Sequence, residues 1–388
     1  MKNKPGRISE AWHRFIYNRF KNNEIKLHEL KLILWESTLR CNLNCLHCGS
    51  DCSADSTSAD MPFKDFLDAI LCVKPAYPNT AITVAITGGE PLLRKDLAEC
   101  GKALIHAGFG WGVVTNGYAY TPQVHARLLD AGMGAISVSL DGLEDSHNWL
   151  RNNTESFSRA INAIRIIAPD TDRLNFDIIT CVSNRNLGEL DRLKELLFSL
   201  GVPAWRLYTI APIGRAGNNP VLQLTSGETK ELLDFIARSR EPPTSTTVRS
   251  FQEEFAREPF VAVQRLQDTG KMDIKFGCEA YTGPYEKKVR SCGFFCRAGI
   301  NIASVLIDGS IAACPNINRG FIQGSIYNDR FIDIWHTRYI PFRNRRWTRK
   351  GPCASCGDFR YCLGGAMHLW PGENGKLMSC LNKSLFSN

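Results

Sequence analysis

The chain has 388 residues, of which 44% are hydrophobic and 22% are charged, and its formal net charge is +8. This length and composition are those of a soluble globular protein with one large domain and a smaller one. No stretch approaches the ~18 uninterrupted apolar residues of a membrane span, and the basic N-terminus lacks the apolar run of a signal peptide. We therefore expect a cytoplasmic protein with no membrane span, and the absence of a nucleic-acid motif predicts no nucleic-acid partner.

Residues 1–30 are predicted to form an N-terminal amphipathic helix. Apolar residues recur there at helical spacing, at Ile8, Trp12, Phe15, Ile16 and Phe20. We expect this helix to cover the core rather than to lie on a membrane surface.

Strands and helices alternate over residues 31–240. Apolar, β-branched runs predict six strands, at 32–35, 82–87, 111–115, 135–140, 176–182 and 205–210. Helical patterns lie between them, at 63–73, 92–107, 122–131, 156–167 and 187–200. Such alternation implies parallel strands with right-handed crossovers, and six strands are too few for a complete eight-fold barrel. The sequence therefore predicts an α/β fold with a partial (β/α)6 TIM-like barrel.

Residues 241–277 break this alternation and are predicted to be a linker or helical segment. Residues 278–388 are predicted to form a small cysteine-rich domain with one β-hairpin, in which the dipeptide at 308–309 is Asp-Gly. Asp-Gly suits the positive backbone angles of a tight hairpin turn. The hairpin brings Cys296 and Cys314 close together, as expected for two ligands of one metal centre.

The cysteines indicate metal binding. The chain has 15 of them, and without a secretion signal they are better explained as metal ligands than as disulfides. Cys41, Cys45 and Cys48 follow the first predicted strand with the spacing C-x3-C-x2-C. Three thiolates can hold three irons of a [4Fe–4S] cluster and leave the fourth iron open for a small molecule. Structural zinc takes four ligands, usually in C-x2-C pairs, and fits this triplet poorly.

Together with the segment Gly88-Gly89-Glu90-Pro91 after the second strand, this triplet resembles the radical S-adenosylmethionine (radical SAM) superfamily. The resemblance covers roughly residues 31–215. It implies that the triplet binds a [4Fe–4S] cluster whose open iron takes the amino and carboxylate groups of S-adenosylmethionine. Reductive cleavage would then give a 5′-deoxyadenosyl radical that abstracts hydrogen from a substrate. An electron donor such as flavodoxin or ferredoxin is implied as well.

The resemblance also implies which residues contact S-adenosylmethionine. Gly88 and Gly89 would let the backbone approach the methionine part, and Glu90 would accept a hydrogen bond from its ammonium group.

Further contacts are expected at the ends of later strands. Ser139 and Asp141 resemble the family's ribose-contacting segment, although Asp141 could instead belong to a helix cap or turn. Asn116 is expected near the cofactor or in a simple turn. His47 would pack near the adenine or lie exposed in its loop, and residues 212–215 are expected to line the pocket.

The C-terminal cysteines resemble the SPASM domain, which carries auxiliary iron–sulfur clusters in radical enzymes that act on peptides and proteins. The matching cysteines are Cys296, Cys314, Cys353, Cys356, Cys362 and Cys380. The last four are implied to hold one auxiliary [4Fe–4S] cluster, for which zinc is an alternative.

A second auxiliary cluster departs from the family pattern, because the family has a further cysteine where this chain has Ala366. Cys296 and Cys314 match, and Cys292 is expected as a third ligand although its spacing is shorter than usual. Either Cys278 supplies the fourth ligand or one iron stays open. We therefore expect one or two auxiliary clusters.

The resemblance implies a radical SAM enzyme that modifies a peptide or protein by crosslinking, epimerisation or oxidation. One alternative is a sulfatase-maturing enzyme, but those relatives carry an Asp directly after the cysteine matched by Cys314, where this chain has Pro315. An alternative of another class is a non-catalytic, metal-stabilised binding protein, against which the intact triplet and Glu90 argue. A basic cluster is expected to be a solvated face or a docking patch for an acidic peptide or a reductase: Arg343, Arg345, Arg346, Arg349 and Lys350.

Overall fold

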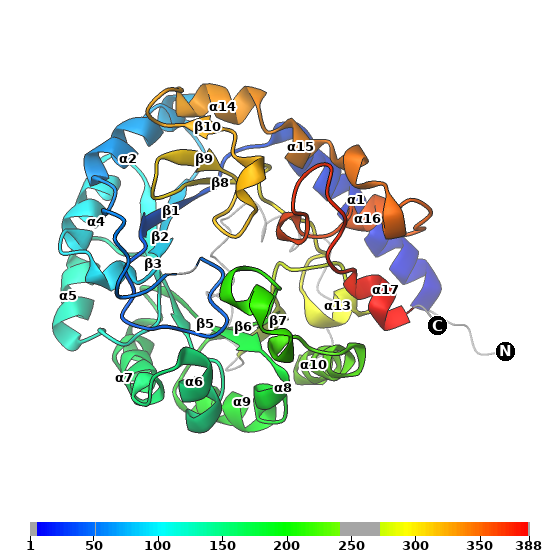
Figure 1. The fold of residues 1–388 in the computed structure, drawn as a ribbon, viewed down its shortest axis with the longest axis horizontal. Helices are drawn as coiled ribbons and strands as arrows, with labels where there is room; N and C mark the ends of the chain where they lie inside the picture. Colours follow the sequence, from blue (N-terminus) through cyan, green and yellow to red (C-terminus); the bar gives the residue numbers. More distant parts are fainter. Residues whose placement is uncertain (1–5, 51, 241–271, 387–388) are drawn as a thin grey trace.

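The computed structural model describes residues 6–50, 52–240 and 272–386. Its centre is a sheet of ten strands in the order β10-β9-β8-β1-β2-β3-β4-β5-β6-β7. The strands from β8 to β7 run parallel, and β9 and β10 continue the sheet antiparallel. Figure 1 shows the sheet curving around a central axis with helices on its outside. The predicted partial barrel with C-terminal hairpin strands is confirmed.

All six predicted strands are present: β1 (Leu32–Thr38), β2 (Thr83–Gly88), β3 (Gly110–Thr115), β4 (Ala135–Ser139), β5 (Asn175–Val182) and β6 (Ala204–Thr209). A further parallel strand, β7 (Asp273–Phe276), pairs with β6 and was not predicted. It lies at the end of the segment expected to be a linker, of which residues 241–271 lie outside the described residues.

The predicted hairpin is formed by β8 (Ile302–Val305) and β9 (Ser310–Ala312), and the short strand β10 (Gly324–Ser325) pairs with β9. Gly309 has φ +80° at the turn, as the Asp-Gly pair predicts. Strand β8 also pairs in parallel with β1, with Ile302 opposite Leu32. The cysteine-rich part of the chain therefore continues the same sheet as the N-terminal strands.

Helices cover the outer face of this sheet. The first ten are α1 (Gly6–Leu27), α2 (Phe63–Ile70), α3 (Val73–Ala76), α4 (Leu97–His106), α5 (Pro122–Asp130), α6 (Glu144–Arg151), α7 (Ser156–Ile167), α8 (Asn184–Leu187), α9 (Leu190–Ser199) and α10 (Ser226–Ser239). The C-terminal part adds α13 (Glu286–Val289), α14 (Phe331–Thr337), α15 (Ile340–Arg343), α16 (Phe359–Cys362) and α17 (Leu381–Phe386). None of the described helices is long and apolar enough to cross a membrane.

The core lies between the sheet and the helices. Trp35 of β1 stacks on Phe66 of α2, with ring centroids 4.5 Å apart, and Trp205 of β6 meets Phe235 of α10 at 5.7 Å. Helix α1 packs against the C-terminal part, where the buried Lys21 donates to the backbone carbonyls of residues 360 and 361. This supports the expectation that α1 covers the core.

The inner face of strands β4 to β6 is polar. The hydroxyl of Ser137 donates to Asp177 Oδ1 at 2.6 Å, and Arg206 forms an ion pair with the same carboxylate. Because side chains alternate along a strand, the apolar neighbours Phe176 and Ile178 face the helices while these polar groups face inward.

Candidate active site

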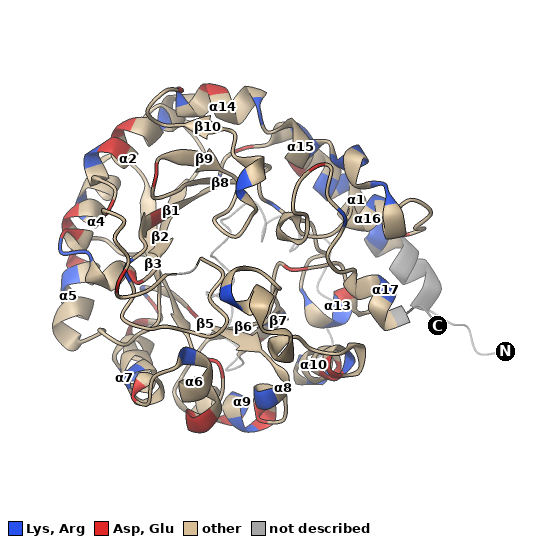
Figure 2. Ribbon diagram, viewed as in Figure 1, with Lys and Arg blue, Asp and Glu red and all other residues tan. Residues whose placement is uncertain are grey.

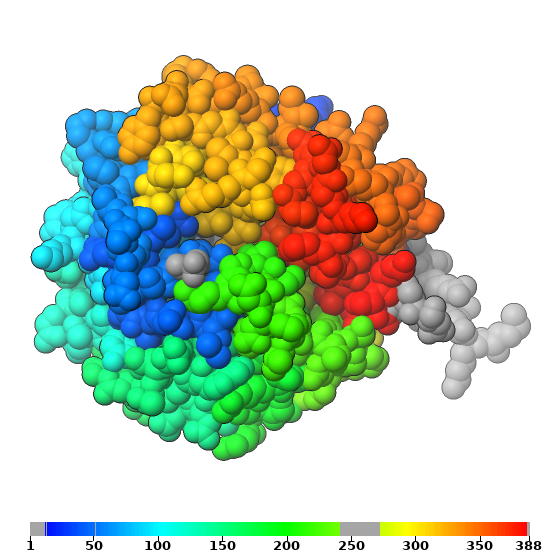
Figure 3. Space-filling model, in the orientation of Figure 1, coloured from blue at the N-terminus to red at the C-terminus, as the bar shows by residue number. Residues whose placement is uncertain are grey.

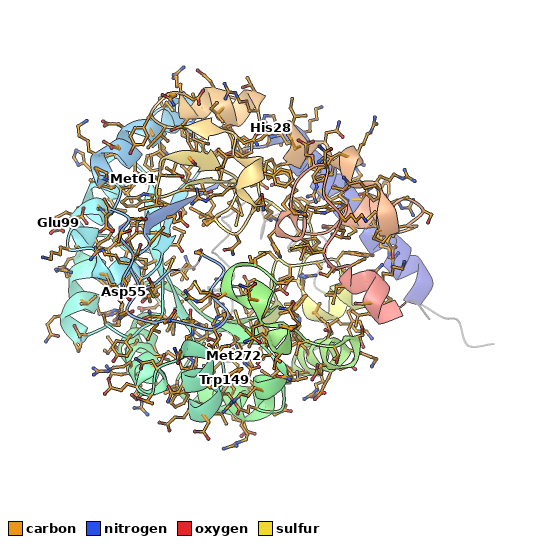
Figure 4. All side chains as sticks on the ribbon, viewed as in Figure 1. His28, Asp55, Met61, Glu99, Trp149 and Met272 are labelled. Atoms are coloured by element: carbon orange, nitrogen blue, oxygen red, sulfur yellow. The ribbon has the colours of Figure 1, made fainter. Side chains whose placement is uncertain are left out.

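The cysteine triplet lies in the long loop between β1 and α2, a loop whose later part is marked by Asp55 and Met61 in Figure 4. Cys41 and Cys45 are buried and Cys48 is half-buried. The pKa of Cys41 is raised to about 12, chiefly by burial and also by the charges of Glu90, Cys45 and Cys48. The three thiols are therefore close neighbours. They follow the carboxyl end of a parallel strand, the side where barrel enzymes have their active sites.

Gly88 and Gly89 lie against the residues at which this loop begins. Gly89 N–H donates to Thr38 O at 2.7 Å, and Glu90 N–H donates to Arg40 O at 2.9 Å. A Cβ at Gly88 would lie 2.2 Å from Thr38 O, and Gly88 also has φ +133°. The two glycines are thus required for close packing of β2 on the end of β1. Their predicted approach to the methionine part of the cofactor stays a prediction.

Glu90 joins the end of β2 to the end of β3. Its buried carboxylate accepts from Thr115 Oγ1 at 2.7 Å, from Asn116 N–H at 2.8 Å and from Leu92 N–H at 3.1 Å. Burial raises the pKa of Glu90, and these three hydrogen bonds oppose that shift. The ammonium contact predicted for Glu90 stays a prediction.

Two N–H donors point at the sulfur atoms of the triplet. Asn116 Nδ2 lies 3.8 Å from Cys41 Sγ, and Arg151 Nη1 lies 3.7 Å from Cys45 Sγ. Donors to a thiolate favour its charged form, which is the form that binds a metal. Asn116 is thus placed at the predicted site. Arg151 was not predicted, because its partner lies 106 residues away in the sequence and no local motif marks the contact.

Asp141 holds Arg151 in position. Its fully buried carboxylate accepts from Arg151 Nε at 2.6 Å and from Cys181 N–H at 2.8 Å. Although burial alone raises the pKa of Asp141, the charge of Arg151 and the hydrogen bond from Cys181 N–H keep it below its usual value. In the structure this carboxylate supports the scaffold of the site, and the predicted ribose contact stays a prediction for Ser139, at the end of β4, and for Asp141.

His47 lies beside this ion pair, with Nε2 4.0 Å from Asp141 Oδ2. Burial lowers the pKa of His47 to about 4, so the ring is neutral at pH 7. His47, Asp141 and Cys181 have ligand atoms within 4.8 Å of one another. The guanidinium of Arg151 on the same carboxylate opposes a cation there, so we do not assign a metal to this group. The predicted packing of His47 near adenine stays a prediction.

The segment after β6 clamps the triplet loop. Arg215 Nε donates to Cys45 O at 2.8 Å, its Nη1 to Cys52 O at 3.0 Å and its backbone N–H to Cys48 O at 2.9 Å. Gly214 has φ +54°, and a Cβ there would lie 2.4 Å from Cys48 O. Figure 3 shows the two segments side by side over the centre of this face. The sequence predicted that residues 212–215 line the pocket but not that they hold the loop.

The four C-terminal cysteines predicted to share one cluster are brought together. They line a cavity of about 540 Å³, and they are Cys353, Cys356, Cys362 and Cys380. The pKa values of Cys353 and Cys362 are raised to about 11 and about 12, chiefly by burial and also by the charge of Cys380. Four thiols that repel one another when ionised form a donor set for a cation.

A second set contains Cys314. Its pKa is raised to about 12, chiefly by burial and also by the charges of Cys278 and Cys296. Cys292, the expected third ligand, lies near Tyr17 of α1. Ala366 is fully buried. The ligand set predicted for this second cluster stays a prediction.

The described thiols do not lie at the spacing of a closed zinc site. Among residues 6–50, 52–240 and 272–386, no three cysteine sulfurs lie within 4.8 Å of one another. Tetrahedral zinc with Zn–S bonds of ~2.3 Å requires sulfurs about 3.8 Å apart. A [4Fe–4S] cluster binds each thiolate at a different iron and therefore accepts wider spacing.

One orphaned donor agrees with a group bound at these cysteines. In the described part of the chain, the buried atom Arg345 Nε finds no hydrogen-bond partner, and the Arg345 guanidinium contacts Cys296. Buried polar groups are nearly always paired, so an acceptor supplied by a bound group would explain this atom.

Comparison with protein families agrees with this geometry. Residues 35–197 match the Radical SAM superfamily, and residues 296–357 match the SPASM iron–sulfur cluster-binding domain. The chain is a radical SAM enzyme with a SPASM domain. The two domain matches confirm the predictions that the chain binds a [4Fe–4S] cluster and S-adenosylmethionine and carries auxiliary iron–sulfur sites.

This radical SAM enzyme has curated relatives along most of its length. It is 26% identical over 341 residues to the AdoMet-dependent heme synthase of Methanosarcina barkeri, covering 86% of this chain and 90% of that protein. It is also 26% identical over 340 residues to the mycofactocin maturase MftC of Mycobacterium tuberculosis, covering 86% and 78%.

Solved structures share the fold. A structure of anSMEcpe with bound AdoMet has a TM-score of 0.64 at 17% identity, covering 92% of this chain and 95% of the other. Streptococcus suis SuiB bound to S-adenosylmethionine has a TM-score of 0.60 at 16% identity, covering 90% and 76%.

Proposed function

We propose that this radical SAM enzyme modifies a peptide or protein substrate. The observation that carries the proposal is that one continuous sheet supports both the triplet site and the cysteine-lined C-terminal sites. Structures of the same fold are bound to peptides, namely SuiB with its precursor peptide SuiA and anSMEcpe with the Cp18Cys peptide. The similarity to a mycofactocin maturase also supports it.

The chain's own residues position the chemistry. Cys41, Cys45 and Cys48 would hold the cluster, which together with S-adenosylmethionine supplies one-electron radical chemistry that removes a hydrogen atom from the substrate. Arg215 fixes the loop by its backbone carbonyls, and Arg151 donates to Cys45. Enclosure of these groups by the loop limits the access of water, which protects reactive intermediates.

The polar inner face of β4 to β6 is the part of the barrel that we assign to the substrate. Ser137, Asp177 and Arg206 form a connected hydrogen-bonded group there, with Arg206 Nη2 3.1 Å from Ser137 Oγ. Such a group can orient the amide groups of a peptide. We keep the division into residues 31–240 for radical generation and 278–388 for auxiliary clusters as part of this proposal.

An electron donor such as flavodoxin or ferredoxin completes the proposal, which places the enzyme in the cytoplasm, where its many thiols stay reduced. Figure 2 shows Lys and Arg over α15 and α16. Arg345 of the predicted basic cluster is buried, and Arg343 donates to the carbonyl of Gly299. The exposed cations are Arg346, Arg349 and Arg360, a smaller patch than predicted, whose charge complements an acidic donor protein.

A second candidate substrate is a haem precursor, because the similarity to heme synthases extends over 341 residues. The two candidates are separated by one experiment. The anaerobically reconstituted enzyme is incubated with dithionite and S-adenosylmethionine, together with either short peptides encoded beside its gene or an iron porphyrin carrying propionate groups. We expect a mass change in a peptide and substrate-dependent release of 5′-deoxyadenosine. Turnover of the porphyrin alone would contradict the peptide proposal.

A further inference from the structure

A buried lysine of α1 lies behind the cysteine-lined cavity of the C-terminal part. Lys21 is fully buried, and its Nζ donates to the backbone carbonyls of Arg360 and Tyr361, the second at 3.0 Å. Both carbonyls belong to α16, whose last residue, Cys362, lines the cavity. Arg14, two helical turns before Lys21 on α1, lines the cavity itself. One face of α1 therefore packs against α16 and this cavity (Figure 1).

The positive charge of Lys21 has no carboxylate to offset it. Among the described residues no acidic side chain forms an ion pair with Lys21, whereas Arg14 is paired with Asp358 at 3.5 Å. The Tyr17 ring centroid lies 5.8 Å from Lys21 Nζ, a cation–π contact that offsets only part of the cost of burying an ammonium group. Burial lowers the pKa of Lys21 to about 8, so the ammonium form still predominates at pH 7.

A helix cap explains the two hydrogen bonds of Lys21 but not its charge. The last carbonyls of α16 have no partner within that single turn, and a lysine side chain can satisfy them. A neutral amide could do the same without burying a charge. The cavity is lined by four thiols, those of Cys353, Cys356, Cys362 and Cys380. Four thiolates carry more negative charge than the [4Fe–4S] core they hold carries positive charge, so a cluster in this cavity is an anion that offsets the buried cation.

We propose that Lys21 is the counter-cation of the iron–sulfur cluster held by these four thiols, and that its charge makes this cluster easier to reduce. One-electron reduction adds a negative charge to the cluster, and a fixed cation in the protein interior stabilises the more negative form. The two family matches begin at residues 35 and 296, so this charge comes from a helix outside both matched domains. The inference rests on the cluster proposed for the four thiols but not on whether the substrate is a peptide or a porphyrin.

The test measures the reduction potential of this cluster in a full-length variant with all three triplet cysteines replaced by Ala. Anaerobically reconstituted samples are titrated with dithionite, and the EPR signal that a further Cys356→Ala removes is assigned to the cavity. Lys21→Met is expected to lower the equilibrium constant for reduction of this cluster at least tenfold, a shift of about 59 mV to lower potential for a one-electron couple. Lys26→Met removes an exposed lysine of the same helix and, as the matched control, should leave the potential unchanged.

A second variant, Lys21→Gln, covers the case in which Lys21→Met fails to fold, and it separates charge from hydrogen bonding. Its amide can still donate to the α16 carbonyls, so the same tenfold loss is expected only if the charge acts on the cluster. An unchanged potential in Lys21→Gln would overturn the proposal, as would an equal shift in Lys26→Met. Loss of iron from Lys21→Gln would assign Lys21 to holding the site together and would overturn its redox role. If no EPR signal depended on Cys356, the cluster itself would be refuted, and this inference with it.

Discussion

The N-terminal triplet and the four C-terminal cysteines are held in place by different means. The triplet loop is fixed by buried polar contacts from β2, β3, α6 and the segment after β6. The C-terminal thiols lie on short turns around a cavity, such as the 3₁₀ turn Gly351–Cys353 and the single-turn helix α16. The sheet therefore preorganises the first site, whereas the second depends on its bound group for its shape.

The largest expected difference between the two regions is in how well each tolerates replacement of a glycine by alanine. At Gly88 a Cβ would lie 2.2 Å from a backbone oxygen, at φ +133°, so Gly88→Ala should prevent correct folding of the triplet loop. Gly351 also has a positive φ, +52°, but nothing lies within 4 Å of its Cβ position. Gly351→Ala should cost only about 1–2 kcal/mol of backbone strain. Soluble yield and chemical unfolding of the two variants measure this, and equal losses would contradict the comparison.

Removal of iron should loosen the two regions unequally. We expect a chelator to increase amide hydrogen exchange over residues 351–382 at least tenfold, because these turns lose the group that joins them. Residues 39–53 should change less, since Arg215 and Glu90 contacts remain. Hydrogen exchange read by mass spectrometry makes the comparison. Greater loosening of residues 39–53 would show that the triplet loop is not preorganised.

Substitution of Arg151 tests the polar scaffold of the triplet. Arg151→Gln leaves the fully buried Asp141 carboxylate without its cation and should lower the free energy of unfolding by about 3–5 kcal/mol. The double variant with Asp141→Asn removes the orphaned charge and should recover part of that loss. Urea unfolding of the apoproteins measures both. A double variant as unstable as the sum of the single variants would show that the two residues act independently.

The smallest expected effect, when taken per pH unit, concerns His147. Burial and the charge of Arg151 lower the pKa of His147 to about 3, from an ordinary value of 6.5. Its contribution to stability is complete above pH 6.5 and is lost as the pH falls towards 3, because only the unfolded chain then takes up the proton. The loss is up to ~1.4 kcal/mol per pH unit. His147→Gln should flatten the decline in stability between pH 6.5 and pH 4, and an unchanged slope would contradict the prediction.

The sequence was sufficient for the repeating part of the fold. Six strands and the hairpin were predicted, because apolar runs and an Asp-Gly turn are local signals. Strand β7 was missed because it has only four residues. The pairing of β8 with β1 joins segments 270 residues apart, which no local pattern can show.

In the candidate site, too, local sequence signals were recognised and contacts across the fold were missed. The cysteine triplet and the glycine–glutamate turn were recognised from their spacing. Arg151 was missed because it acts through a contact across the fold, and Arg215 was predicted to line the pocket but not to clamp the loop. Cys278 was left as an alternative to an open iron, since its separation from Cys296 in the sequence gives no spacing signal. Long-range packing of the curved sheet brings Arg151 and Arg215 to the loop, and the ligand role of Cys278 stays a prediction.

The most direct measurement is release of 5′-deoxyadenosine from S-adenosylmethionine by dithionite-reduced, anaerobically reconstituted protein. We predict that the wild-type protein releases it and that the variant with Cys41, Cys45 and Cys48 replaced by Ala does not, although it retains auxiliary-cluster iron. Continued release from the triplet variant would contradict the assignment of the active site.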